Sequence, residues 1–207
     1  MNRDSTSKSD TNTNTLRILF VGTADTCRSP LAAALMQQQV AINGLSVEIT
    51  SAGLVDGGKP AHPHAISCLQ KIGIDLSQHC SHKVSAIQVD GADFILAMTT
   101  QQVFDLVERF PAALPRTHTA RHLIRYAKPR KEGQGMLSWA REANASLQHN
   151  YVSENVDLDI ADPSGLPEQT FNELRNDLTA LFSWLCRLIA GDAMQYRLLP
   201  ISHRINS

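Results

Sequence analysis

The chain has few aromatic residues, no excess of charge of either sign and no long apolar run. Phe, Trp and Tyr make up 5% of its 207 residues, and the formal net charge is -1 with a pI near 6.7. This balance provides no positive field that would attract nucleic acid or a membrane surface. No apolar stretch approaches the ~18 residues of a transmembrane helix. We therefore expect neither nucleic acid nor a membrane as a partner.

Cysteine is also sparse, and none of the four cysteines forms a CxxC pair. There is no signal-peptide pattern, so reduced thiols and a cytoplasmic location are expected. Cys68 and Cys186 fall in helical apolar patterns that predict core positions. Cys80 lies between His79 and His82, but three such residues so close together, without a second cluster, are weak evidence for zinc. Without a Gly-rich nucleotide fingerprint either, we predict no metal and no cofactor.

Apolar periodicity divides the chain into strands that alternate with helices. Strands are predicted at 16–21, 46–50 and 93–98, and helices at 30–42, 63–72, 101–110 and 166–189. Two further helices are predicted at 117–127 and 136–147. The alternation implies parallel strands joined by helical crossovers, hence an α/β fold with a central parallel sheet between helical layers, a three-layer sandwich. We expect a disordered extension over 1–15, one domain over 16–190 with a helical insertion at about 111–156, and a tail over 191–207.

The segment from Leu16 to Met36, LRILFVGTADTCRSPLAAALM, is the most informative part of the chain. An apolar run leads into a short loop that ends in Arg28, and a helix follows, with Ser29 expected as its N-cap and Pro30 as its first residue. A loop between a strand and a helix N-terminus directs backbone N–H groups and the helix dipole at an anion. The expected anion-binding residues are Gly22, Thr23, Ala24, Asp25, Thr26, Cys27 and Arg28.

Further motifs follow this loop in a fixed order. They are ITSAG at 49–53, expected as a strand and a tight bend, HPHAISCLQKIGIDLSQH at 62–79, ADFILAM at 92–98 and DIADPSG at 159–165. The ordered set resembles the low-molecular-weight protein tyrosine phosphatases across about residues 16–190. The resemblance implies the three-layer α/β sandwich of that family and its activity, the hydrolysis of phosphate monoesters on proteins.

The family's chemistry carries over only in part. Its loop reads Cys, five residues, Arg, Ser/Thr, and the cysteine is the nucleophile. Arg28 matches the arginine that clamps the phosphate, Ser29 the hydroxyl that hydrogen-bonds the thiolate, and Asp162 the general acid. Six residues before Arg28, however, the chain has Gly22, which has no side chain. The resemblance therefore implies that no covalent phosphoenzyme forms at the usual position.

Three other residues also differ from the family pattern in ways that disfavour catalysis. Asp25 stands where the family usually has Asn, and an ionised carboxylate near the loop would oppose a phosphate dianion. Ala24 replaces a usual Gly, and Ser164 takes the place of an aromatic residue that would face the phosphotyrosine ring. We therefore predict a catalytically impaired member, a pseudophosphatase, that binds phosphate or a phosphorylated protein.

Two alternatives remain open at this point. The chain could be an active phosphatase with a non-standard nucleophile, either Cys27 or a water activated near Asp25 or Asp162. It could instead be a non-catalytic interaction module that binds an unknown protein partner through the 111–156 segment.

Overall fold

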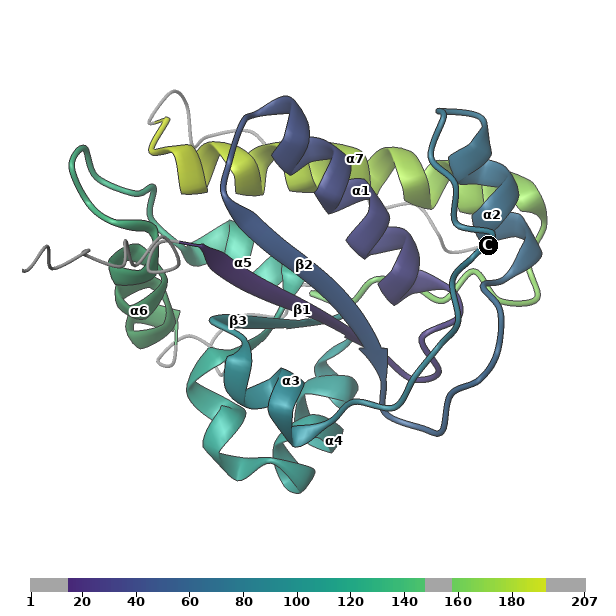
Figure 1. The fold of residues 1–207 in the computed structure, drawn as a ribbon, viewed down its shortest axis with the longest axis horizontal. Coiled ribbons are helices and arrows are strands. Elements are labelled where there is room, and N and C mark those ends of the chain that lie inside the picture. Colours follow the sequence, from purple (N-terminus) through teal and green to yellow (C-terminus); the bar gives the residue numbers. More distant parts are fainter. Residues whose placement is uncertain (1–14, 148–157, 193–207) are drawn as a thin grey trace, which may run out of the picture.

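A four-stranded parallel sheet lies at the centre of the molecule, in the order β2-β1-β3-β4 (Figure 1). The computed structural model describes residues 15–147 and 158–192. The strands are β1 (Leu16–Gly22), β2 (Val47–Gly53), β3 (Phe94–Ala97) and β4 (Thr117–Thr119). The register of β1 and β2 runs without interruption from Leu16 opposite Val47 to Gly22 opposite Gly53. Two glycines therefore lie side by side where these strands end.

Helices cover both faces of the sheet (Figure 1). One layer contains α1 (Arg28–Ile42), α2 (Pro63–Gln70), α5 (Ala120–Tyr126), α6 (Met136–Leu147) and α7 (Glu168–Ala190). The other contains α3 (Ala86–Gly91), α4 (Thr100–Arg109) and the 3-10 helix η1 (Pro111–Arg116). The predicted three-layer α/β sandwich with a parallel sheet is confirmed.

The side chains of β1 alternate between the two helical layers, as those of a strand buried on both faces must. Ile18 and Phe20 pack toward α1 and α7, whereas Leu19 and Val21 pack toward α3 and α4. Phe20 meets Phe182 of α7 edge to face, with ring centroids 5.3 Å apart. This two-sided burial holds the end of β1, and the loop that follows it, in a fixed position.

Several predicted boundaries were wrong. Helix α1 begins at Arg28 with Cys27 at its N-cap, so Ser29 is not the cap. Its hydroxyl donates a hydrogen bond to Asp25 instead. Strand β2 continues through Ser51 to Gly53, where the sequence predicts a tight bend, because these residues pair with the end of β1.

The region after α4 differs most from the sequence prediction. Residues Thr117–Thr119 form the edge strand β4, which pairs with β3, and the helix predicted from 117 begins only at Ala120. The elements α3 and η1 were not predicted at all. The remaining predicted helices agree with the structure to within two residues at each end. Trp139 of α6 packs edge to face on Phe94 of β3, so the described part of the 111–156 segment contributes to the core.

Parts of the predicted domain plan lie outside the described residues. They are residues 1–14 of the expected extension, 148–157 around the end of the expected insertion, and 193–207 of the expected tail. Within the described ranges, no helix is both long and apolar enough to cross a membrane.

Candidate phosphate-binding site

The loop between β1 and α1 is held from several sides by backbone hydrogen bonds. The carbonyls of Gly22 and Thr23 accept from the amides of Leu54 and Val55, each at 3.0 Å. The carbonyl of Thr26 accepts from the amide of His62 at 2.6 Å. These hydrogen bonds hold the loop against the segment that follows β2 and the segment that precedes α2.

Two further residues fix the loop, and sequence reasoning did not identify either role. Gln102, buried in α4, donates from Nε2 to the hydroxyl of Thr23 at 3.0 Å and accepts from the amide of Met98 at 3.0 Å. Gly53 lies directly against the loop, because a Cβ there would be 3.0 to 3.2 Å from backbone atoms of residues 23–25. The glycine of the ITSAG motif therefore permits a close approach of two backbones.

Asp25 is the one non-glycine residue with a positive φ among the described residues, at +52°. Asp tolerates this left-handed conformation better than most residues. Its side chain is 1% exposed, Oδ1 accepts from the Ser29 hydroxyl at 3.0 Å, and Oδ2 has no hydrogen-bond partner in the described chain. Burial raises the pKa of Asp25, although Ser51, His79, Ser29 and His82 act in the opposite direction.

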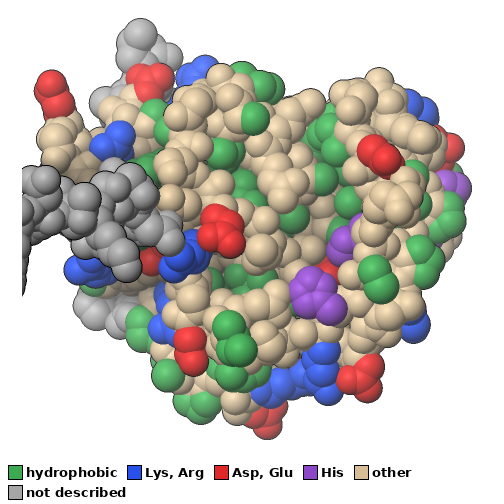
Figure 2. Space-filling view, viewed as in Figure 1, with side chains coloured by type: hydrophobic (Ala, Val, Ile, Leu, Met, Phe, Trp, Pro, Cys, Tyr) green, Lys and Arg blue, Asp and Glu red, His purple; other side chains and the backbone are tan. Residues whose placement is uncertain are grey.

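His79 has a structural role here that its sequence pattern did not reveal. Its Nε2 donates to the backbone carbonyl of Asp25 at 2.6 Å and lies 3.5 Å from Oδ2 of the same residue. His82 Nδ1 is 3.9 Å from that oxygen. Figure 2 shows exposed histidine side chains on the face where β2 ends. No set of residues suited to a metal ion occurs within the ranges described.

Arg28 and Asp162, predicted as the clamp and the general acid, are in direct contact. Arg28 Nη2 donates to Asp162 Oδ2 at 2.7 Å, and Nη1 donates to the carbonyl of Ile160 at 2.8 Å. Burial alone would raise the pKa of Asp162, but hydrogen bonds from Ser164 and the Arg28 charge outweigh it and place the pKa below its usual range. Asp162 is therefore ionised at neutral pH, and a bound phosphate must share Arg28 with it.

Cys27 does not have the environment of a nucleophilic thiol. It is 8% exposed, and burial together with the nearby Asp162 charge raises the pKa of the thiol to about 12. Reactive cysteines instead have depressed pKa values in electropositive, accessible surroundings. The thiol of Cys27 is therefore almost entirely protonated at neutral pH.

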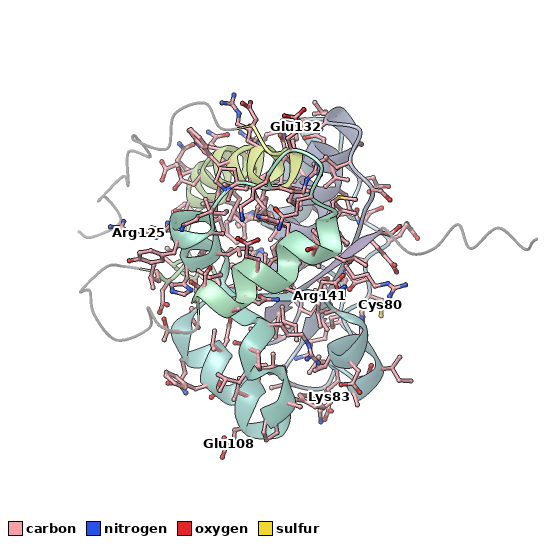
Figure 3. All side chains as sticks on the ribbon, turned by 90° about the vertical axis from the view of Figure 1, so that its left-hand side faces the viewer. Cys80, Lys83, Glu108, Arg125, Glu132 and Arg141 are labelled. Carbon is pink, nitrogen blue, oxygen red and sulfur yellow. The ribbon has the colours of Figure 1, made fainter. Side chains whose placement is uncertain are left out.

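This difference leads to a testable prediction about thiol reactivity. Cys80 is exposed, whereas Cys27, Cys68 and Cys186 are buried; Figure 3 labels Cys80 at the edge of the molecule. In the native protein, we expect a disulfide-exchange reagent to modify Cys80 at least about tenfold faster than the other three. The Cys80→Ser variant should lose the fast phase. A fast phase that persists in that variant would show that a buried thiol is reactive.

Gly22 is the last residue of β1 and the first of the loop, and Ser29 occupies the space beside it. A Cβ built on Gly22 would lie 2.6 Å from Ser29 Oγ and 3.2 Å from Ser29 Cβ. The backbone of Gly22 is not in the left-handed region. A side chain is therefore excluded here by the present position of Ser29 rather than by the conformation of the main chain.

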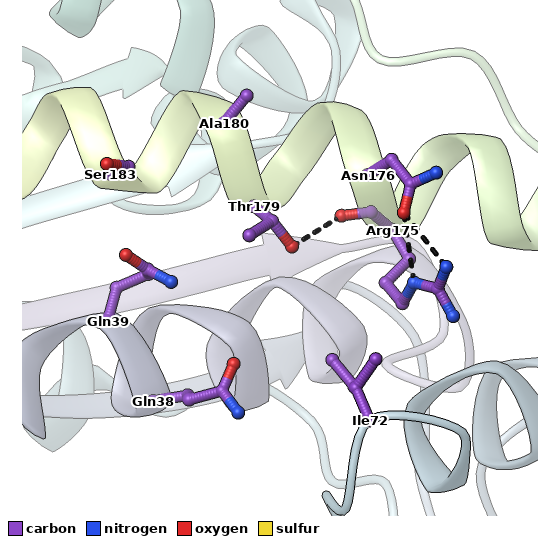
Figure 4. Close-up of a pocket in the computed structure, with 8 residues that line it drawn as sticks. All are labelled: Gln38, Gln39, Ile72, Arg175, Asn176, Thr179, Ala180 and Ser183. Atoms are coloured by element: carbon purple, nitrogen blue, oxygen red, sulfur yellow. Dashed lines mark hydrogen bonds between the residues drawn. The ribbon is translucent and has the colours of Figure 1, made fainter. Parts of the chain in front are cut away.

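The structure also has a shallow groove between α1 and α7, shown in Figure 4. Most of the side chains that line it are polar, and the Arg175 guanidinium is hydrogen-bonded to Asn176. The groove is lined by Gln38, Gln39, Ile72, Arg175, Asn176, Thr179, Ala180 and Ser183. None of the predicted site residues belongs to it, so the β1–α1 loop remains the candidate site.

A parallel α/β sandwich with a hydrogen-bonded loop between its first strand and first helix, and an Arg–Asp pair beside that loop, defines an α/β class of protein suited to anion binding at that loop. The family model for low molecular weight phosphotyrosine protein phosphatase matches residues 17–137. The chain therefore belongs to this family, and the resemblance drawn from its motifs is confirmed.

Individual relatives are named either as arginine phosphatases or as tyrosine phosphatases. The chain is 33% identical over 170 residues to a protein-arginine-phosphatase of Geobacillus stearothermophilus, covering 82% of this chain and 93% of the relative. The structure of the YwlE arginine phosphatase from the same organism superposes with a TM-score of 0.62 at 32% identity, covering 83% and 90% of the two chains. A probable tyrosine phosphatase, EpsP of Ralstonia solanacearum, is 37% identical over 95 residues, covering 46% of this chain and 63% of its own.

Proposed function

We propose that this protein binds a phosphate group carried by a protein side chain and is catalytically impaired. One observation carries the proposal: Gly22 stands at the family's nucleophile position, and the Ser29 hydroxyl fills the space that a cysteine there would need. Because Gly22 has no side chain, the thiolate attack of the family has no attacking atom. The loop, Arg28 and the N-terminus of α1 remain in place to receive an anion.

The ligand class follows from the family and its named relatives. Both phosphotyrosine and phosphoarginine present the same terminal phosphoryl group, and both names occur among the relatives. Arg28 can offer a planar fork of donors to that group, as guanidinium groups do to phosphate. A cytoplasmic location stays a prediction.

The alternative of an active phosphatase that uses Cys27 receives no support from the site. A buried thiol with a pKa near 12 supplies almost no thiolate at neutral pH. The Cys27 thiol also lies near the ionised Asp162 carboxylate, whose charge further disfavours the thiolate.

Anion binding tests the proposal directly. We expect Arg28→Ala to weaken sulfate binding at least about tenfold, because it removes a charge-assisted hydrogen-bond donor from the loop. Arg17→Ala is the matched control, since Arg17 lies at the far end of β1 in an exposed pair with Glu48. Affinity can be measured from the shifts of backbone amide NMR signals during titration. No saturable shifts in the wild type, or an equal loss in both variants, would contradict phosphate binding at this loop.

A further inference from the structure

Asp25 places a negative charge inside the loop that is built to receive an anion. Its carboxylate is buried and belongs to the loop itself, and the Ser29 hydroxyl that donates to its Oδ1 also lies beside Gly22. A dianion in the loop and an ionised carboxylate within the same loop repel each other, and the low polarity of the buried surroundings strengthens that repulsion.

Four side chains of the described residues approach the Asp25 carboxylate: Ser29, Ser51, His79 and His82. Ser29 of α1 donates a hydrogen bond to Oδ1, and a hydrogen bond from the Ser51 hydroxyl of β2 lowers the pKa of the carboxyl group. From the loop before α3, His79 and His82 approach Oδ2 at 3.5 and 3.9 Å. Neither imidazole forms a hydrogen bond to Oδ2, and no described group donates a well-formed hydrogen bond to that oxygen, although the Ser51 hydroxyl lies close enough to the carboxyl group to lower its pKa. A buried carboxylate with one oxygen that lacks a donor favours its neutral, protonated form.

We propose that binding of a phosphorylated ligand at the loop is coupled to the uptake of one proton by Asp25. The proposal rests on the proposed function and adds its regulation. In the free protein, no dianion in the loop opposes the Asp25 carboxylate, and the Asp162 carboxylate beside the loop is paired with Arg28. When the dianion binds, a proton from the solvent adds to Oδ2, which neutralises the carboxylate and removes the repulsion. The affinity of the loop therefore falls as pH rises.

Sulfate is the suitable probe, because it stays a dianion across the neutral range while phosphate itself titrates. For the wild type, we expect the Kd of sulfate to rise with pH between about pH 5 and 8, by up to about tenfold per pH unit, the limit for one coupled proton. Asp25→Asn keeps the size and shape of the side chain but cannot ionise. It should bind sulfate at pH 8 more tightly than the wild type and show a much flatter pH profile.

The control variant is Asp90→Asn, which removes an exposed carboxylate outside the loop and should keep the wild-type profile. A second measurement requires no substitution: the 13C signal of the Asp25 carboxyl group should titrate at higher pH when sulfate is saturating. A wild-type profile as flat as that of Asp25→Asn, with binding intact, would overturn the proton coupling and leave the proposed function standing. An absence of sulfate binding by wild type and Asp25→Asn at every pH would overturn both.

Discussion

The Gly22→Cys variant is expected to hydrolyse para-nitrophenyl phosphate at least about a hundredfold faster than the wild type, whose turnover should stay at background. The substitution returns a thiol to the end of β1, next to the N-terminus of α1, where a helix dipole depresses thiol pKa values. The main chain at residue 22 accepts an L side chain without strain. The remaining obstacle is Ser29, whose Oγ would lie 2.6 Å from the new Cβ.

Ser29 can remove this clash by rotating about χ1, at the cost of its hydrogen bond to Asp25. The matched control is Gly22→Ala, which adds the same Cβ and displaces Ser29 in the same way but supplies no nucleophile. Only the cysteine variant should gain activity. Comparable turnover by wild type or by Gly22→Ala would show that another group attacks phosphorus, and the proposed impairment would be wrong.

The strand and helix on either side of the loop were predictable, because their signals are local. The apolar run of β1 is buried on both faces, and Pro30 lies in the first turn of α1. The sequence also placed Arg28 and Asp162 in one site, but only through the order of motifs in the family. Their direct contact at 2.7 Å joins residues 134 positions apart, which no periodicity reveals.

The failures have a common physical cause in tertiary contacts that override local preference. Thr117–Thr119 looked like the beginning of a helix, yet pairing with β3 makes it a strand whose residues are all buried. Ser29 looked like an N-cap, but its hydroxyl is used by Asp25. The His79-Cys80 pattern was only weak evidence for zinc, and the contact of His79 with a backbone carbonyl 54 residues earlier in the chain was not predicted. Each of these corrections, except β4, concerns the support of the β1–α1 loop.

Replacing Asp25 by Asn is expected to stabilise the free protein at about pH 8 by at least about 1–3 kcal/mol, because Asn fills the same space without the buried charge and its desolvation cost. Burial raises the pKa of Asp25 above its value in the unfolded chain. Above the folded-state pKa, the wild type therefore carries the full penalty of the buried charge. As pH falls through that pKa the folded protein takes up the proton, so the penalty shrinks, and it is gone below the unfolded-state pKa.

The stability advantage of Asp25→Asn over the wild type should therefore be larger at about pH 8 than at about pH 5. Urea unfolding of both proteins at the two pH values measures it, with Asp90→Asn as the exposed control that should match the wild type at each. Destabilisation by Asp25→Asn at pH 8 would mean that attraction to His79 and His82 outweighs burial. In that case Asp25 would be a favourable ion-pair partner, and the binding of an anion would not favour proton uptake by its carboxylate. The stability measurement on the free protein and the sulfate titration are thus two independent tests of the charge on Asp25.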